Sequence, residues 1–214
     1  MNTEHFIQQG QHAKTTLSEL RRIRSMVQAT EALSLFAYAT QSGLAAFDWE
    51  FGPDFWEGTT TRWLFGIDYG RTQPQAIRAL CEKPNSTVRI HDGAWVAQQS
   101  GFLPRQDFHL KTSFLRCAVL GKLGVVTGSG NFSSNGLRRS VEAGTSIFID
   151  SMVGDVKIVE DGWNTANEFW GSATPAEQIL DDYEDKWRNS FSRSAQNQTE
   201  EVAIPGPREI FWIE

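Results

Sequence analysis

Two residues that could act on an anion, His109 and Lys111, stand two positions apart in the segment 107–115, whose pattern is typical of a β-strand. Successive side chains of a strand point to opposite faces. The imidazole and the ammonium group are therefore expected side by side on one face, with the apolar side chains of the segment on the other. This placement would let a histidine and a lysine contact the same anionic group of a substrate.

A glycine-rich loop is expected directly after the next strand-like segment, 119–127. Its glycines allow tight turns and a close approach of the backbone to a ligand. Its amides, with the side chains of Ser129 and Asn131, can donate hydrogen bonds to anionic oxygens. A neutral imidazole can attack phosphorus to form a phosphohistidine, and lysine and asparagine can hold the charge on the non-bridging oxygens. The two segments together predict phosphodiester chemistry.

A carboxylate behind the imidazole would fix the tautomer of the ring, and Glu142 is the candidate for this role. The scheme needs no metal ion. The sequence also lacks a carboxylate cluster of the kind that magnesium nucleases use. Neither a metal nor another cofactor is expected.

These residues resemble the signature of the phospholipase D superfamily, in which H-x-K is followed by four residues, D, six residues and G-S-x-N. The chain departs from this signature in two ways: Arg116 occupies the Asp position, and the interval to G-S-x-N is longer. The first departure affects the support of the loop more than the nucleophile. Glu142 lies where many family members carry a Glu. The matching residues are His109, Lys111, Gly128, Ser129 and Asn131.

The first half of the chain resembles the nuclease-like branch of the same superfamily. A T-x-S-G-L motif that contains Ser42 follows an apolar segment, and a G-x-D-x-x-x-T motif contains Asp68. The resemblance thus extends over roughly residues 30–190. It implies that Ser42 and Asp68 lie near the substrate, although an Asp that caps a turn is an equally good interpretation of Asp68.

Four further residues around the glycine-rich loop are candidates for substrate contacts. Gly128 and Ser133 belong to the loop, and Arg138 and Arg139 follow it. The two arginines are suited to a nucleic-acid backbone, and they are equally well explained as solvated residues of a short helix.

The resemblance implies a metal-independent endonuclease that cleaves DNA. The chain holds one H-x-K motif, because Gly93 stands where a second motif beginning at His91 would need lysine. In this superfamily two motifs make one active site, so a homodimer or a larger even oligomer with a shared site is expected. Relatives of this size often serve restriction or anti-phage systems beside a HerA-type ring ATPase or a helicase, which the resemblance implies as a partner.

Two other functions remain open. One is a lipid phosphodiesterase of the same superfamily, which the absence of a basic amphipathic helix disfavours. The other is a catalytically degenerate dimeric scaffold that binds a motor ATPase. Arg116 supports the scaffold, whereas the presence of His109, Lys111, Asn131 and Glu142 together argues against it.

The composition of the chain bears on its attraction for nucleic acid and on its cellular compartment. The 214 residues carry a formal net charge of −6, so any attraction for nucleic acid must be local, or a partner must supply it. The two cysteines, Cys81 and Cys117, stand in no metal-ligand spacing, and the simplest compartment is a reducing cytoplasm. No apolar run approaches the roughly 20 residues that span a bilayer, and the first residues lack the pattern of a signal peptide.

The elements that must position these residues are predicted to form an α/β fold. Strand-like segments that alternate with helical patterns indicate a mixed sheet flanked by helices, and the resemblance implies a phospholipase D-like sandwich. Residues 1–190 are expected to form the nuclease domain and residues 191–214 a mobile tail. Strands are expected at 33–38, 62–67, 87–91, 107–115, 119–127 and 141–149.

Helices are expected at 75–82 and around Trp163. Two more are expected to begin at Thr16, which with Glu19 resembles a capping box, and at Thr174, which precedes a proline. The residues 40–43 are expected to form a turn. No element is expected in the polar residues 1–11, and His12 lies just after them.

Overall fold

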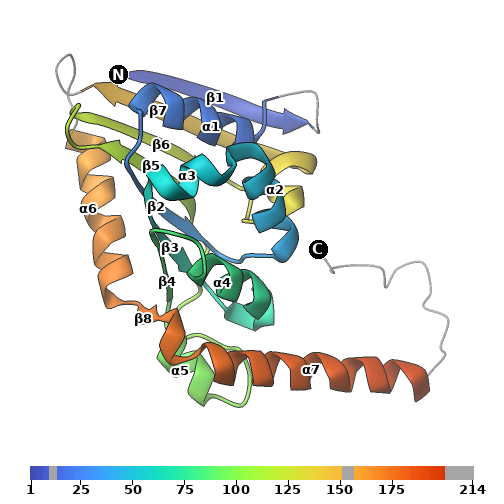
Figure 1. The fold of residues 1–214 in the computed structure, drawn as a ribbon. Coiled ribbons are helices and arrows are strands. Elements are labelled where there is room, and N and C mark those ends of the chain that lie inside the picture. Colours follow the sequence, from blue (N-terminus) through green and yellow to red (C-terminus); the bar gives the residue numbers. More distant parts are fainter. Residues whose placement is uncertain (10–13, 151–156, 201–214) are drawn as a thin grey trace.

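The computed structural model describes residues 1–9, 14–150 and 157–200, which form one β-sheet with helices on both faces (Figure 1). This confirms the predicted α/β class. None of the helices in the described ranges is long and apolar enough to cross a membrane.

The sheet is mixed, as predicted. Within the described residues its order is β1-β7-β6-β5-β2-β3-β4-β8. The pairs β2–β3 and β3–β4 are parallel, and all other neighbours are antiparallel. The strands are β1 (Asn2–Gln9), β2 (Glu31–Phe36), β3 (Thr60–Phe65), β4 (Ser86–Ile90), β5 (Lys111–Cys117), β6 (Lys122–Gly128), β7 (Val141–Asp150) and β8 (Thr174–Pro175).

The longer helices are α1 (Thr16–Val27), α2 (Gln41–Phe51), α3 (Pro53–Gly58), α4 (Pro74–Cys81), α5 (Gly93–Gln98), α6 (Lys157–Ser172) and α7 (Leu180–Glu200). Parallel strands need crossover connections, which α2 and α3 supply between β2 and β3, and α4 supplies between β3 and β4. Helices α1 to α4 cover one face of the sheet and α6 covers the other (Figure 1). Three short turns of helix complete the fold: η1 (Asp68–Gly70), η2 (Asn135–Arg139, of the π type) and η3 (Ala176–Gln178).

An aromatic cluster fills the core between the sheet and α2. Its centre is Phe132, whose side chain is fully buried. The ring centroid of Phe132 lies 5.1 Å from that of Trp63, 5.5 Å from Phe36, 5.7 Å from Phe47 and 5.9 Å from Phe65. Aromatic pairs at these separations stabilise a core beyond the area that they bury. The loop that follows β6 is thereby anchored in the interior.

Most predicted elements are confirmed with shifts of a few residues at their ends. The segments 33–38, 62–67, 87–91, 119–127 and 141–149 correspond to β2, β3, β4, β6 and β7. The helix predicted at 75–82 is α4, and Trp163 lies on α6 with its side chain buried against the sheet.

The prediction of a turn at residues 40–43 is wrong, because these residues begin α2. The side chain of Thr40 caps the helix by accepting a hydrogen bond from the backbone N–H of Gly43, at 3.1 Å. The helix that was expected to begin with a Thr16 cap is instead capped by Thr15. Thr15 and Ser18 exchange side-chain hydrogen bonds with each other's backbone N–H, which makes the capping box one residue earlier than predicted.

The prediction of a helix from Thr174 is also wrong. Thr174 pairs with Ile90 as part of β8, and its hydroxyl accepts a hydrogen bond from the N–H of Ala94 at 3.0 Å. The η3 turn follows, and α7 begins only at Leu180. The Thr174 hydroxyl, which was expected to cap a helix that follows it, therefore accepts a hydrogen bond from α5, a helix in a distant part of the sequence.

Helix α7 continues to Glu200, past the expected domain boundary, and its far end extends away from the body of the molecule (Figure 1). Residues 201–214 of the expected tail lie outside the described residues.

The polar start of the chain forms a strand that was not predicted. β1 pairs in antiparallel register with β7, and Gln8 within it is completely buried. The Gln8 amide Nε2 donates to the carbonyl oxygens of Asn135, Gly136 and Ser140, at 3.3, 3.3 and 2.9 Å. Its Oε1 accepts from the backbone N–H of Thr16 at 2.9 Å. One side chain thus joins β1, η2 and the start of α1.

We expect Gln8→Ala to lower the free energy of unfolding by about 2–4 kcal/mol, because it strands several buried backbone groups without partners. Urea denaturation followed by circular dichroism measures this change. The control is Gln9→Ala, an exposed neighbour on the same strand, which should stay within about 0.5 kcal/mol of the unmodified chain. Equal stability of the two variants would contradict the role assigned to Gln8.

Candidate functional site

The candidate site lies at one edge of the sheet, where the carboxyl ends of β2, β3 and β6 meet the start of β5. The pairing directions dictate this meeting, because β5 runs antiparallel to β2 and β6. The connecting segments surround a pocket of about 100 Å³. Polar and aromatic residues that line it are Tyr38, Asp68, Tyr69, Arg71, Phe108, His109, Lys111 and Asn131.

His109 is exposed and lies immediately before β5, which begins at Lys111. The prediction that a strand already covers residue 107 is therefore wrong, and strand alternation does not explain how the two side chains come together. They meet because both line the pocket, and because the Lys111 ammonium donates to the carbonyl oxygen of His109 at 2.8 Å. Within the described chain, the His109 imidazole has no hydrogen-bond partner, so both ring nitrogens are free to meet a substrate.

Lys111 is half-buried, and this burial lowers the pKa of its ammonium group below the usual value. The negative charge of Glu142 acts in the opposite direction and raises the pKa of Lys111. A half-buried ammonium group has lost part of its hydration shell, so it interacts more strongly with an anion than an exposed lysine does. Lys111 is therefore well suited to hold a phosphate oxygen.

Asn131 is held in the pocket by the residue that follows it. The backbone of Phe132 forms a parallel bridge with Ala39, in which the Phe132 N–H donates to Tyr38 O at 3.2 Å and Phe132 O accepts from Thr40 N at 2.9 Å. A side chain at Gly43 would approach Phe132 O to 2.2 Å, so only glycine fits there. The Asn131 Oδ1 atom is buried and has no partner in the described chain.

Ser129 and Glu142 lie beside this pocket and interact with each other. The Ser129 hydroxyl donates to Glu142 Oε2 and accepts from the N–H of Ala143 at 3.1 Å. Glu142 thus contacts the glycine-rich loop directly in this structure, and its action on His109 stays a prediction. Gly128 lines a neighbouring groove of about 530 Å³, together with Ile7 of β1.

The remaining predicted contacts lie further from the pocket. Ser133 is buried, and its hydroxyl accepts from the N–H of Gly136 at 3.0 Å, so its side chain points into the loop. Arg138 is half-buried and Arg139 exposed on η2. Ser42 is exposed in the first turn of α2, where its hydroxyl shares a hydrogen bond with that of Thr40. The structure brings none of these four residues into the pocket with His109.

Asp68 is buried beneath the pocket and positions the residue before His109. Its Oδ2 accepts from the backbone N–H of Phe108 at 2.8 Å, and its Oδ1 is buried without a partner in the described chain. Burial raises the pKa of the Asp68 carboxyl group above its usual value.

Four of these pocket residues, Tyr38, Tyr69, Arg71 and Phe108, were not predicted as site residues. Tyr69 and Arg71 stand within the G-x-D-x-x-x-T motif that pointed to Asp68, and this motif was the signal that could have indicated them.

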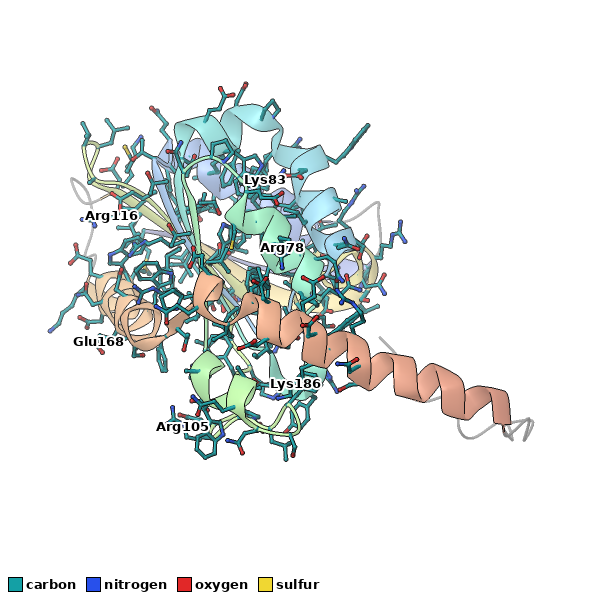
Figure 2. The ribbon with its side chains drawn as sticks, turned by 60° about the horizontal axis from the view of Figure 1, so that its bottom comes forward. Arg78, Lys83, Arg105, Arg116, Glu168 and Lys186 are labelled. Atoms are coloured by element: carbon teal, nitrogen blue, oxygen red, sulfur yellow. The ribbon has the colours of Figure 1, made fainter. Side chains whose placement is uncertain are left out.

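Arg116, at the position where the superfamily signature has Asp, lies at the other end of β5 from the pocket. Its guanidinium group is 5.5 Å from the ring centroid of Trp163, on the side of the molecule that carries α6 (Figure 2). Arg116 therefore packs against α6 and does not line the pocket. No group of three or more His, Cys, Asp or Glu side chains within the described ranges is arranged to hold a metal ion.

No protein-family model and no curated protein sequence matches the chain. Solved structures do resemble it. NucT from Helicobacter pylori matches with a TM-score of 0.53 and 16% identity over 81% of this chain and 99% of NucT. Nuc from Salmonella typhimurium matches with a TM-score of 0.52 and 12% identity over 81% of this chain and 98% of Nuc.

Phosphatidylserine synthase from Haemophilus influenzae also matches, with a TM-score of 0.52 and 12% identity. That match covers 94% of this chain and 48% of the synthase, so this chain spans about half of the larger protein. At such identities the likeness concerns the fold. Nuc is described as a phospholipase D family member, and the chain shares its fold.

Proposed function

We propose that the chain is a phosphodiester hydrolase, an endonuclease that cleaves DNA through a phosphohistidine intermediate and needs no metal ion. The observation that carries this proposal is that His109, Lys111 and Asn131 line one small pocket. The likeness of the fold to NucT and to Nuc, a phospholipase D family member, supports it. The pocket offers a nucleophile, a half-buried cation and an amide within reach of a single phosphate group.

The first step is attack of a His109 ring nitrogen on phosphorus. A phosphorus–nitrogen bond forms, the bond from phosphorus to the leaving sugar oxygen breaks, and that oxygen takes up a proton from an acid. Lys111 and Asn131 stabilise the charge on the non-bridging oxygens in the transition state. In the second step the group that gave up its proton takes one from a water molecule. The water oxygen bonds to phosphorus, the phosphorus–nitrogen bond breaks, and the imidazole is free again.

The acid is His109 of a second copy of the chain, related by a two-fold axis. No other histidine of the described residues lines the pocket: the His5 imidazole bonds the Thr145 hydroxyl at 2.8 Å, and the ring of His91 stacks on Phe108 at 4.7 Å between centroids. A homodimer or larger even oligomer supplies the missing group. The groove beside the site, with the exposed Ile7 next to it, offers apolar surface that a second copy would cover.

A motor ATPase of the HerA type or a helicase is the partner that we propose, in a restriction or anti-phage system. The support is electrostatic. The chain carries a net charge of −6, so it attracts DNA only near the site, and a partner that grips the duplex would overcome this weakness. A catalytically degenerate scaffold is disfavoured, because the Arg116 departure lies away from the pocket.

His109→Ala should reduce cleavage of plasmid DNA by about 10⁴-fold or more, because the nucleophile is lost. The assay contains EDTA throughout, since the unmodified chain should remain active without free metal ions. Lys111→Ala should lose about 10²–10³-fold, and Lys122→Ala, at the other end of the sheet, is the matched control. Full activity of folded His109→Ala, or strict dependence on added magnesium, would contradict the mechanism.

Glu142→Gln should lower the pKa of Lys111. In the unmodified chain the Glu142 charge raises this pKa against the effect of burial, so the neutral amide leaves only the lowering effect of burial. NMR titration of the Lys111 side-chain methylene next to the nitrogen measures the shift. Glu168→Gln, on the exposed face of α6 (Figure 2), should leave the Lys111 titration unchanged. A Lys111 pKa that is the same in all three proteins would show that Glu142 does not act on this lysine.

Light scattering of the isolated protein should give a mass of about twice 24.1 kDa, or a larger even multiple. The physical reason is that one copy supplies one histidine to a reaction that needs a nucleophile and an acid. A strictly monomeric protein that cleaves DNA at the same concentration would overturn the shared site. Activity that appears together with dimerisation only when the motor partner is added would mean that the partner drives dimer formation.

A further inference from the structure

The pocket has an aromatic wall that phosphate chemistry does not explain. Tyr69 lines the pocket beside His109, yet 50% of the residue is exposed. Most large aromatic side chains on the neighbouring β2 and β3 are, in contrast, fully buried in the core, as Phe36 and Trp63 are. A half-exposed ring next to His109 offers a flat apolar surface to the part of the substrate that lies beside the phosphate.

Tyr69 also has an unusual backbone conformation. Its φ of 58° and ψ of 14° lie in the left-handed region, which disfavours residues other than glycine, asparagine and aspartate. Its N–H donates to Phe102 O at 2.9 Å, which holds this conformation. Backbone strain of this kind persists where the surrounding structure imposes it, and it occurs frequently at ligand-binding sites.

Two hydrogen bonds tie the loop of Asp68 and Tyr69 to the segment that carries the histidine. The Tyr69 hydroxyl donates to Asp107 Oδ1 at 3.1 Å. In the opposite sense, the backbone N–H of Phe108 donates to Asp68 Oδ2 at 2.8 Å. The adjacent residues Asp68 and Tyr69 are therefore hydrogen-bonded to the adjacent residues Phe108 and Asp107. These bonds keep the backbone of Tyr69 close to the segment that carries His109.

We propose that Tyr69 is the stacking platform for the nucleobase next to the phosphate that is cleaved, and that the site therefore prefers single-stranded DNA. This rests on the proposed nuclease function. A phosphate has no apolar surface, whereas every base has a flat face that can stack on an aromatic ring. In a duplex these faces are stacked on neighbouring bases, so only an unpaired base can use Tyr69 without a cost of unstacking. Arg71, which lines the same pocket, contacts the adjacent phosphate.

Binding measurements separate the base from the phosphate. The probe is a fluorescent oligothymidylate, compared with an oligonucleotide of equal length made of abasic sites and with a hairpin duplex. All proteins carry His109→Ala so that no cleavage occurs, and anisotropy gives the dissociation constants. Tyr69→Ala should weaken binding of oligothymidylate by about tenfold and leave binding of the abasic strand unchanged. Tyr69→Phe keeps the ring and should bind nearly as the parent does.

The control is Trp49→Ala, which removes a ring that is 83% exposed on α2, far along the helix from its end at the pocket. It should change none of the three constants. Equal loss on the base-bearing and abasic strands after Tyr69→Ala would overturn the proposal, as would a hairpin bound as tightly as the single strand by the parent. Failure of the nuclease function is distinguishable, because it appears as absence of cleavage in the chain with His109 intact, whereas base dependence is measured by binding alone.

Discussion

The structure depends above all on the burial of Phe132. Because its ring is enclosed by aromatic side chains from β2, α2 and β3, the loop after β6 has one available path. Asn131 precedes this anchor directly, so its position beside His109 follows from the packing of the core. The bridge from the Phe132 backbone to Ala39 extends the same constraint to the segment after β2. A polar site with little internal hydrogen bonding is thus held in place from beneath by apolar contacts.

Three residues that line the pocket, His109, Lys111 and Asn131, could be predicted from the sequence because they belong to one recognisable motif. The neighbouring strands β5 and β6 could be predicted as well, although β5 begins only at Lys111 and does not include His109. The mechanism of their meeting could not be predicted, because His109 lies before β5 and is placed by contacts from Asp68, which is distant in the sequence. The left-handed backbone conformation of Tyr69 could not be predicted either, because tyrosine is not a residue type that favours a positive φ.

The elements that were missed share one property: they contact partners that are distant in the sequence. β1 shows little apolar alternation, and its buried residue Gln8 is polar, so its sequence pattern is typical of a solvated segment. Gln8 is buried because its amide bonds η2 and the start of α1. Thr174 has the residue type of a helix cap but bonds α5. Gly43 suggested a turn, whereas the structure needs glycine there because α2 begins against the backbone of Phe132.

The pairing of β1 with β7 also determines how early during synthesis this side of the sheet can form. β1 is made well before its partner strand, which lies in a distant part of the sequence. Contacts so distant in sequence form slowly, because a large loop must close before they stabilise anything. Until then the backbone groups of η2 and α1 that Gln8 binds lack its amide as a partner, and the edge of β7 is open to other chains. A chain in which β1 has not yet paired therefore has an unsupported loop and a sheet edge prone to aggregation, and the docking of this one strand removes both.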